Sequence, residues 1–140
     1  VMPTWRSFFQ GYHFAYENYA GDEVPEEFHK EFKVINLING YRERGHLFTE
    51  TNPVRQRRSY SPDLSYVNFG LDKSDLNQEF QAGVELGIGV STLQEIINHL
   101  EEVYCQHIGV EFMHIQDIIK KNWIKNTLES SRNSLKFEKE

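Results

Sequence analysis

The strongest constraint on the fold is a run of apolar residues at helical spacing in the last third of this 140-residue chain. The apolar side chains recur at steps of three and four, which places them on one face of an α-helix: Leu93, Ile96, Ile97, Leu100, Val103 and Tyr104. Thr92 and Glu95 have the spacing of a capping box at its start. The sequence therefore predicts an amphipathic helix whose apolar face lies in a core.

Two segments nearer the N-terminus also have helical spacing. A helix from about residue 25 to about residue 45 would begin at Pro25 and end near Gly45, and its two apolar stripes predict a central helix that is buried on most sides. Before it, a segment over residues 3–19 aligns five aromatic side chains on one face: Trp5, Phe8, Phe9, Tyr12 and Tyr16. This earlier segment is interpreted as an arm that packs on its own domain or on another part of a larger protein.

The remaining chain is read as one long irregular segment and two further helices. Pro53 and Pro62 exclude a continuous helix between residues 46 and 73. A short helix over residues 74–82 follows, and residues 109–115 are the best candidate for extended backbone. The last helix should cover residues 116–130 and bury four apolar side chains: Ile119, Trp123, Ile124 and Leu128.

Together these patterns predict an all-α fold. We expect a small irregular helical domain of four to five helices with a long loop, preceded by an N-terminal helical arm. Residues 1–22 would be the end of the arm and residues 23–140 the helical domain. A chain of 140 residues is long enough to bury a core of its own.

Charge and composition argue against several classes of protein. The net charge of −6 disfavours binding to nucleic acid and to anionic membrane surfaces, both of which require basic patches. No apolar run approaches the roughly 20 residues of a membrane span, and residues 1–10 do not resemble a signal peptide. Cys105 is the single cysteine, which rules out an internal disulfide and a cysteine-based zinc site and favours a reducing compartment.

A local excess of arginine is the main candidate for a contact site. The segment from residue 42 to residue 58 carries +3 in an acidic chain, and guanidinium groups suit carboxylates and phosphates. The segment is either an anion-binding or partner-binding surface, or a set of arginines that pair with the chain's own acidic residues. Its candidate residues are Arg42, Arg44, His46, Arg55, Arg57 and Arg58. His46 could serve acid–base chemistry or make a structural hydrogen bond.

Other chemical motifs are weak. His107, Glu111 and His114 lack the spacing of a helical zinc-binding motif, and Cys105 reads as a small core residue. Neither a phosphate-binding glycine loop nor a nucleophile elbow is present. From these residues we assign no catalytic, cofactor-binding or metal-binding side chain.

Several segments resemble the decarboxylating component of 2-oxoglutarate dehydrogenase complexes. The run Leu37-Ile38-Asn39-Gly40-Tyr41-Arg42-Glu43-Arg44-Gly45-His46 resembles that family's Leu-Ile-Asn-x-Tyr-Arg-x-Arg-Gly-His signature. Residues 104–115 resemble its Tyr-Cys-x-x-Ile-Gly-x-Glu-Tyr-Met-His-Ile. Shorter matches keep the same order along the chain: residues 3–9, 51–54, 68–71 and 123–124. The collinear matches identify the chain as the N-terminal helical portion of such a protein.

The resemblance implies a large enzyme of which this chain is a fragment. Complete family members are homodimers that bind thiamine diphosphate through Mg²⁺ with a Gly-Asp-Gly…Asn motif. They act with succinyltransferase and dihydrolipoyl dehydrogenase components in the bacterial cytoplasm or the mitochondrial matrix. In this chain Glu23 follows Gly21 and Asp22, so the cofactor motif is not present. We therefore expect an inactive structural domain that contacts the remaining domains; the alternative is a free-standing helical interaction module.

Overall fold

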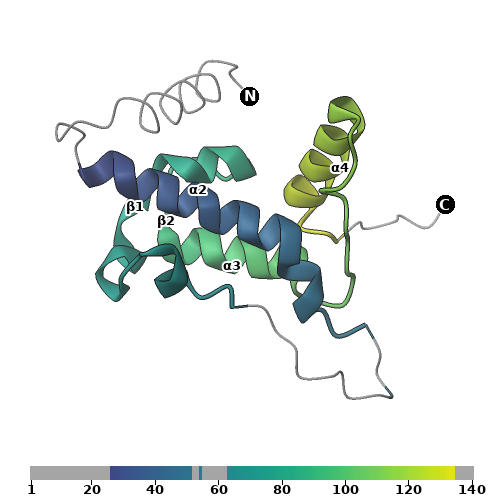
Figure 1. Cartoon of the computed structure of the whole chain (residues 1–140), viewed down its shortest axis with the longest axis horizontal. Helices are drawn as coiled ribbons and strands as arrows, with labels where there is room; N and C mark the ends of the chain where they lie inside the picture. The colour runs from purple at the N-terminus through teal and green to yellow at the C-terminus, as the bar shows by residue number, and fades with distance from the viewer. Residues whose placement is uncertain (1–25, 52–53, 55–62, 135–140) are drawn as a thin grey trace.

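The computed structural model describes residues 26–51, residue 54 and residues 63–134, and the predicted N-terminal arm and Arg55–Arg58 lie outside them. The described part is a small helical domain, which confirms the predicted fold class (Figure 1). Its α-helices are α2 (Glu26–Arg44), α3 (Leu93–Tyr104) and α4 (Ile118–Ser131). Short 3₁₀ helices are η1 (Gly45–Phe48), η2 (Tyr66–Phe69), η3 (Lys73–Asn77) and η4 (Gln81–Leu86).

The core lies where α2 and α3 run side by side (Figure 1). From α3 it receives the whole predicted apolar stripe, including Leu100, which is fully buried. The second half of α2 contributes Val34, Leu37, Ile38 and Tyr41, whereas Phe28 near its start is exposed. The expectation that α2 is buried on most sides therefore holds only for its second half.

The start of α3 is fixed by the predicted capping box. The Thr92 hydroxyl oxygen accepts a hydrogen bond from the Glu95 N–H, and a Glu95 carboxylate oxygen accepts one from the Thr92 N–H at 2.8 Å. Immediately before the helix, strand β2 (Ser91–Thr92) pairs antiparallel with β1 (Glu79–Phe80), with Phe80 opposite Ser91. This short pairing attaches the N-terminal end of α3 to the chain that precedes it.

The single helix expected over residues 74–82 was wrong, because η3, β1 and η4 occupy this stretch. Contacts from α2 hold the separate pieces in place. Lys30 donates to the buried Asp75 at 2.7 Å, while the Glu31 carboxylate accepts from the Gln81 and Ala82 N–H groups at 2.7 and 3.0 Å. Residues 109–115, the best candidate for extended backbone, form no strand and include a turn at Met113 and His114.

Helix α4 is bounded by polar caps at both ends. Asp117 accepts hydrogen bonds from the Ile119 and Lys120 N–H groups at 3.0 and 3.2 Å. At the C-terminal end the C-cap Arg132 and the following Asn133 both have a φ of 52°, a left-handed conformation that asparagine tolerates. The Asn133 side-chain amide donates to the carbonyl oxygens of Val103 and Ile108 at 3.1 and 3.2 Å, which ties α4 to the end of α3.

The inward face of α4 differs from the predicted one. Ile124 and Leu128 pack against the core as expected, but Ile119 is 82% exposed and Trp123 is 69% exposed. Their expected burial was therefore wrong. Within the described residues, no helix combines the length and the apolar character that a membrane crossing requires.

Candidate functional site

A buried ion pair joins α2 to α4. Arg42 Nε donates to Glu129 Oε1 at 2.7 Å and Arg42 Nη2 donates to Glu129 Oε2 at 3.1 Å, a two-pronged geometry that suits guanidinium and carboxylate. Arg42 is 6% exposed and Glu129 is 2% exposed. Because the pair is removed from water, each charge depends on the other for its solvation.

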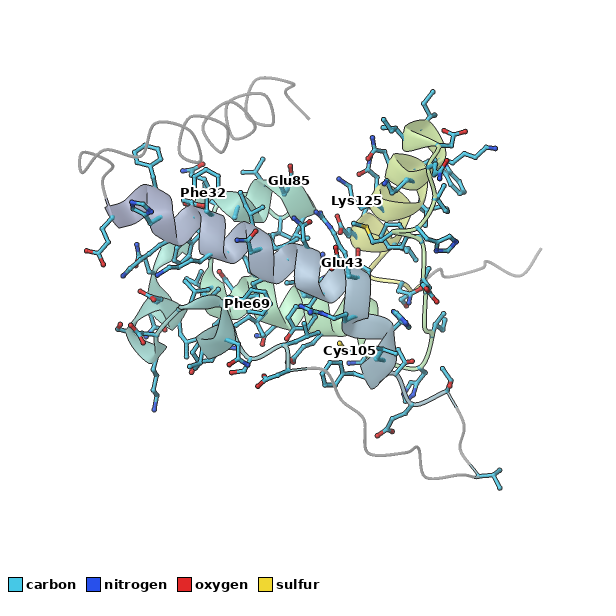
Figure 2. The ribbon with its side chains drawn as sticks, viewed as in Figure 1. Phe32, Glu43, Phe69, Glu85, Cys105 and Lys125 are labelled. Atoms are coloured by element: carbon cyan, nitrogen blue, oxygen red, sulfur yellow. The ribbon has the colours of Figure 1, made fainter. Side chains whose placement is uncertain are left out.

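Four further side chains, three of them partly exposed, complete a cluster around the buried Arg42 and Glu129. The Tyr104 hydroxyl, from the end of α3, donates to Glu129 Oε1 at 2.7 Å, and Arg42 Nη1 donates to Asn39 Oδ1 at 3.2 Å. Glu85 Oε2, from η4, lies 3.7 Å from Arg42 Nη2 and 3.8 Å from Lys125 Nζ of α4. Figure 2 labels Glu85 and Lys125 on these two elements. Hydrogen bonds and ion pairs from α2, α3, α4 and η4 therefore converge on one point.

The electrostatics of the cluster favour the ion pair. Burial opposes the charge on Arg42, but hydrogen bonding to Glu129 and the charge of that carboxylate outweigh it, so the pKa of Arg42 is raised. Burial, followed by the charge of Glu129, raises the pKa of Tyr104 far above its ordinary value. Tyr104 therefore stays a neutral donor, and neither group is poised to exchange a proton near neutral pH.

His99 lies on the buried side of α3 near this cluster. Neither of its ring nitrogens has a well-aligned hydrogen-bond partner among the described residues. Burial, followed by the charge of Arg132, lowers the pKa of His99, while Glu129 and Glu102 oppose the shift. The imidazole is therefore held in its neutral form, and it sits where acidification would place a charge in the interior.

The structure separates the candidate residues of the arginine-rich segment. Arg42 pairs with Glu129, which corresponds to the alternative that these arginines pair with the chain's own acids. Arg44 is exposed, and half-buried His46 has its Nε2 4.0 Å from a Glu111 carboxylate oxygen. The other candidates, Arg55, Arg57 and Arg58, lie outside the described residues.

Sequence reasoning missed Glu129, Tyr104 and Glu85 as partners of Arg42. A signal was present, because Arg42 follows Ile38 by one helical turn on the apolar side of α2. On α4, Glu129 directly follows the inward-facing Leu128. Charged residues on the buried sides of two helices require partners, but the sequence does not say which residues these are.

A cavity of about 750 Å³ lies beside α2 and α3, and Tyr41, Glu101 and Cys105 are among its lining residues. Burial and the nearby Glu101 raise the pKa of the Cys105 thiol to about 12, and burial raises that of the Tyr41 hydroxyl. A thiol with such a pKa is a poor nucleophile at neutral pH. Cys105 is half-buried against the core, as predicted for a small packing residue.

The described residues offer no ready metal centre. No three histidine, cysteine, aspartate or glutamate side chains among them gather as a metal ion requires. The buried carboxylates are occupied, Glu129 by Arg42 and Tyr104 and Asp75 by Lys30. Among the described residues, these two buried carboxylates are therefore engaged in contacts within the domain.

These features define a small helical domain whose elements are joined by a buried ion-paired cluster. The chain is homologous to 2-oxoglutarate dehydrogenase E1 components, over their N-terminal region. It is 41% identical to the E1 component of Azotobacter vinelandii over 114 residues, which cover 79% of this chain and 12% of that protein. To the E1 component of Haemophilus influenzae it is 37% identical over 112 residues, covering 72% of this chain and 11% of that protein.

A third relative carries a different name. The multifunctional 2-oxoglutarate metabolism enzyme of a Mycobacterium species is 36% identical over 103 residues, which cover 71% of this chain and 8% of that enzyme. The similarity to these relatives thus extends over only about a tenth of their length. No protein-family model matches the sequence.

Proposed function

We propose that this chain is a structural helical domain of a 2-oxoglutarate dehydrogenase E1 protein and supplies no catalytic group. The complete protein would convert 2-oxoglutarate to CO₂ and a succinyl group on lipoyl-lysine. The observation that carries this proposal is the 41% identity over 114 residues, confined to 12% of the relative. That share of a large enzyme is too small to hold a site clamped between several domains.

The contacts of the described residues agree with a structural, non-catalytic role for the domain. Thiamine diphosphate supplies carbanion stabilisation when bound to an enzyme, and Mg²⁺ holds its phosphates. The buried carboxylates of this domain already stabilise Arg42 and Lys30, so they cannot serve a cation without leaving those charges unpaired. The cofactor and Mg²⁺ are therefore assigned to the rest of the complete protein.

The proposal also specifies partners and a compartment. The domain would contact the remaining domains of its own polypeptide, and the complete protein would form a homodimer. It would work with succinyltransferase and dihydrolipoyl dehydrogenase components in the bacterial cytoplasm or the mitochondrial matrix. The bacterial origin of the relatives supports the first of these compartments.

An antibody raised against the 140-residue chain provides a test. The native polypeptide captured from its source should be several times longer than this chain, since the relatives are. Supplied with thiamine diphosphate, Mg²⁺ and an electron acceptor, it should release labelled CO₂ from 2-oxoglutarate labelled at carbon 1. A long native polypeptide without this activity would contradict the proposal.

The alternative is a free-standing helical interaction module, and the exposed Ile119 and Trp123 on α4 favour it. Apolar side chains gathered on one helix face are characteristic of a contact surface. The mass of the native polypeptide separates the two functions. A native protein of about the size of this chain would support the module and exclude the enzyme domain.

A further inference from the structure

We propose that the outward apolar face of α4 is the surface on which this domain docks against another domain of the same polypeptide. We define this α4 face as Ile119 and Trp123. The inference rests on the proposed function, because it requires a longer polypeptide. It identifies the contact surface, which the family resemblance leaves open.

The α4 face is unusually exposed for such large side chains. Ile119 and Trp123 are 82% and 69% exposed, and they are one helical turn apart on the same side of the helix. The other side of the same helix packs Ile124 and Leu128 against the core. A helix with apolar residues on opposite sides belongs between two packed bodies, and the described residues provide only one of them.

The α4 helix cannot rotate to bury these side chains within its own domain. Trp123 and Glu129 are six residues apart, which places their side chains about 120° apart around the helix. Turning Trp123 inward would withdraw Glu129 from Arg42 and leave a buried guanidinium unpaired. Asn133 and the Arg132–Glu102 pair, at 2.8 Å, also fix the C-terminal end of α4. The domain therefore presents the α4 face outward in a fixed orientation.

The length of the homologous relatives identifies the occupant of the α4 face. The matched segment covers only 12% and 11% of two of them, so most of such a polypeptide lies outside this domain. A second domain in the same polypeptide can be held by a small contact, because the tether supplies a high effective concentration. Contacts between domains of one chain are commonly modest and partly polar, and Asp117 and Lys120 provide a polar border here.

Hydroxyl-radical footprinting of two samples tests this inference. The 140-residue chain and the native longer polypeptide are oxidised in parallel, and labelling of Trp123 and Ile119 is read by mass spectrometry. We expect both residues to be labelled severalfold more slowly in the longer polypeptide. Val67, exposed on η2, serves as the internal reference. Equal labelling of Trp123 in the two samples would overturn the docking surface, even where the polypeptide decarboxylates 2-oxoglutarate.

A substitution separates docking from self-association. Trp123→Gln should leave the melting temperature of the 140-residue chain unchanged and lower that of the longer polypeptide, whereas Lys73→Gln on η3 should change neither. Concentration-dependent dimerisation of the 140-residue chain that Trp123→Gln abolishes would assign the α4 face to a second copy and overturn the proposal. A native polypeptide no longer than this chain would overturn the inference together with the proposed function.

Discussion

At the scale of residues, two arginine–glutamate pairs have similar hydrogen-bond lengths in different surroundings. Arg42 reaches Glu129 at 2.7 Å in the interior, and Arg132 reaches Glu102 at 2.8 Å at the surface. Breaking a buried pair leaves a charge without solvation, at a cost of about 3–5 kcal/mol. An exposed pair contributes about 0–1 kcal/mol, because water solvates the separated groups.

We therefore expect Glu129→Gln to lower the free energy of unfolding by about 3–5 kcal/mol and Glu102→Gln by less than about 1 kcal/mol. Urea denaturation of the two variants, followed by circular dichroism, measures both values. Similar losses in the two variants would show that the buried cluster does not hold α4 to α2.

The lowered pKa of His99 should make the stability of the domain depend on pH. Burial and the charge of Arg132 hold its pKa below the ordinary value, so the unfolded chain takes up a proton at a higher pH than the folded domain. Stability is then fully present above about pH 6.5 and falls as the pH is lowered towards the depressed folded pKa. The melting temperature should decrease over this window in the parent chain.

Substitution of His99 isolates its contribution to this slope. His99→Gln should flatten the decrease in melting temperature, while His107→Gln, at an exposed position, should leave the slope unchanged. An unaltered slope in His99→Gln would assign the pH dependence to other groups.

At the scale of elements, we expect an apolar-to-alanine substitution to lower stability strongly on α3 and hardly at all on the exposed side of α4. Leu100 is fully buried in the α2–α3 core, so Leu100→Ala should cost about 2–5 kcal/mol. Ile119 is 82% exposed, so Ile119→Ala should change the stability of the 140-residue chain by less than about 0.5 kcal/mol. Chemical denaturation measures both, and a loss below about 1 kcal/mol for Leu100→Ala would mean that its stripe does not face the core.

The same two helices show what sequence patterns can predict. The start and buried face of α3 follow from local spacing and a local capping box, so both predictions were confirmed. Helix α4 has apolar residues on both sides, and its inward side is set by contacts such as Glu129 with Arg42, 87 residues away in sequence. Non-local contacts from Lys30 and Glu31 likewise divided the helix expected over residues 74–82. Local periodicity does not contain this information.

The candidate site was less predictable than the fold for the same reason. The arginine-rich segment was recognised from local charge, but Arg42 has its principal partner on α4, at the other end of the domain sequence. Its pairing with Glu129, Tyr104 and Glu85 joins four elements, and no short motif encodes such a combination. The sequence therefore offered pairing with the chain's own acidic residues as one of two alternatives, but it did not indicate that Glu129 is the partner of Arg42 or that the pair is buried.

At the scale of the whole molecule, the proposed function requires a catalytic part of the polypeptide that is separate from this helical domain. The collinear motifs predicted the homologous proteins, because they are sequence features and need no knowledge of packing. The α4 face is instead a property of the folded domain, and it appears only once the inward side of α4 is known. The homologous family is thus recognised from the sequence alone, whereas the α4 face is recognised only from the folded structure.

The most direct test of this division is a pair of calorimetric titrations with thiamine diphosphate and Mg²⁺. The account predicts saturable binding to the native longer polypeptide and no saturable heat with the 140-residue chain. Leu100 and its neighbours give that chain a core of its own, and circular dichroism verifies that it is folded during the titration. Micromolar saturable binding to the 140-residue chain, or its absence from the longer polypeptide, would contradict the account.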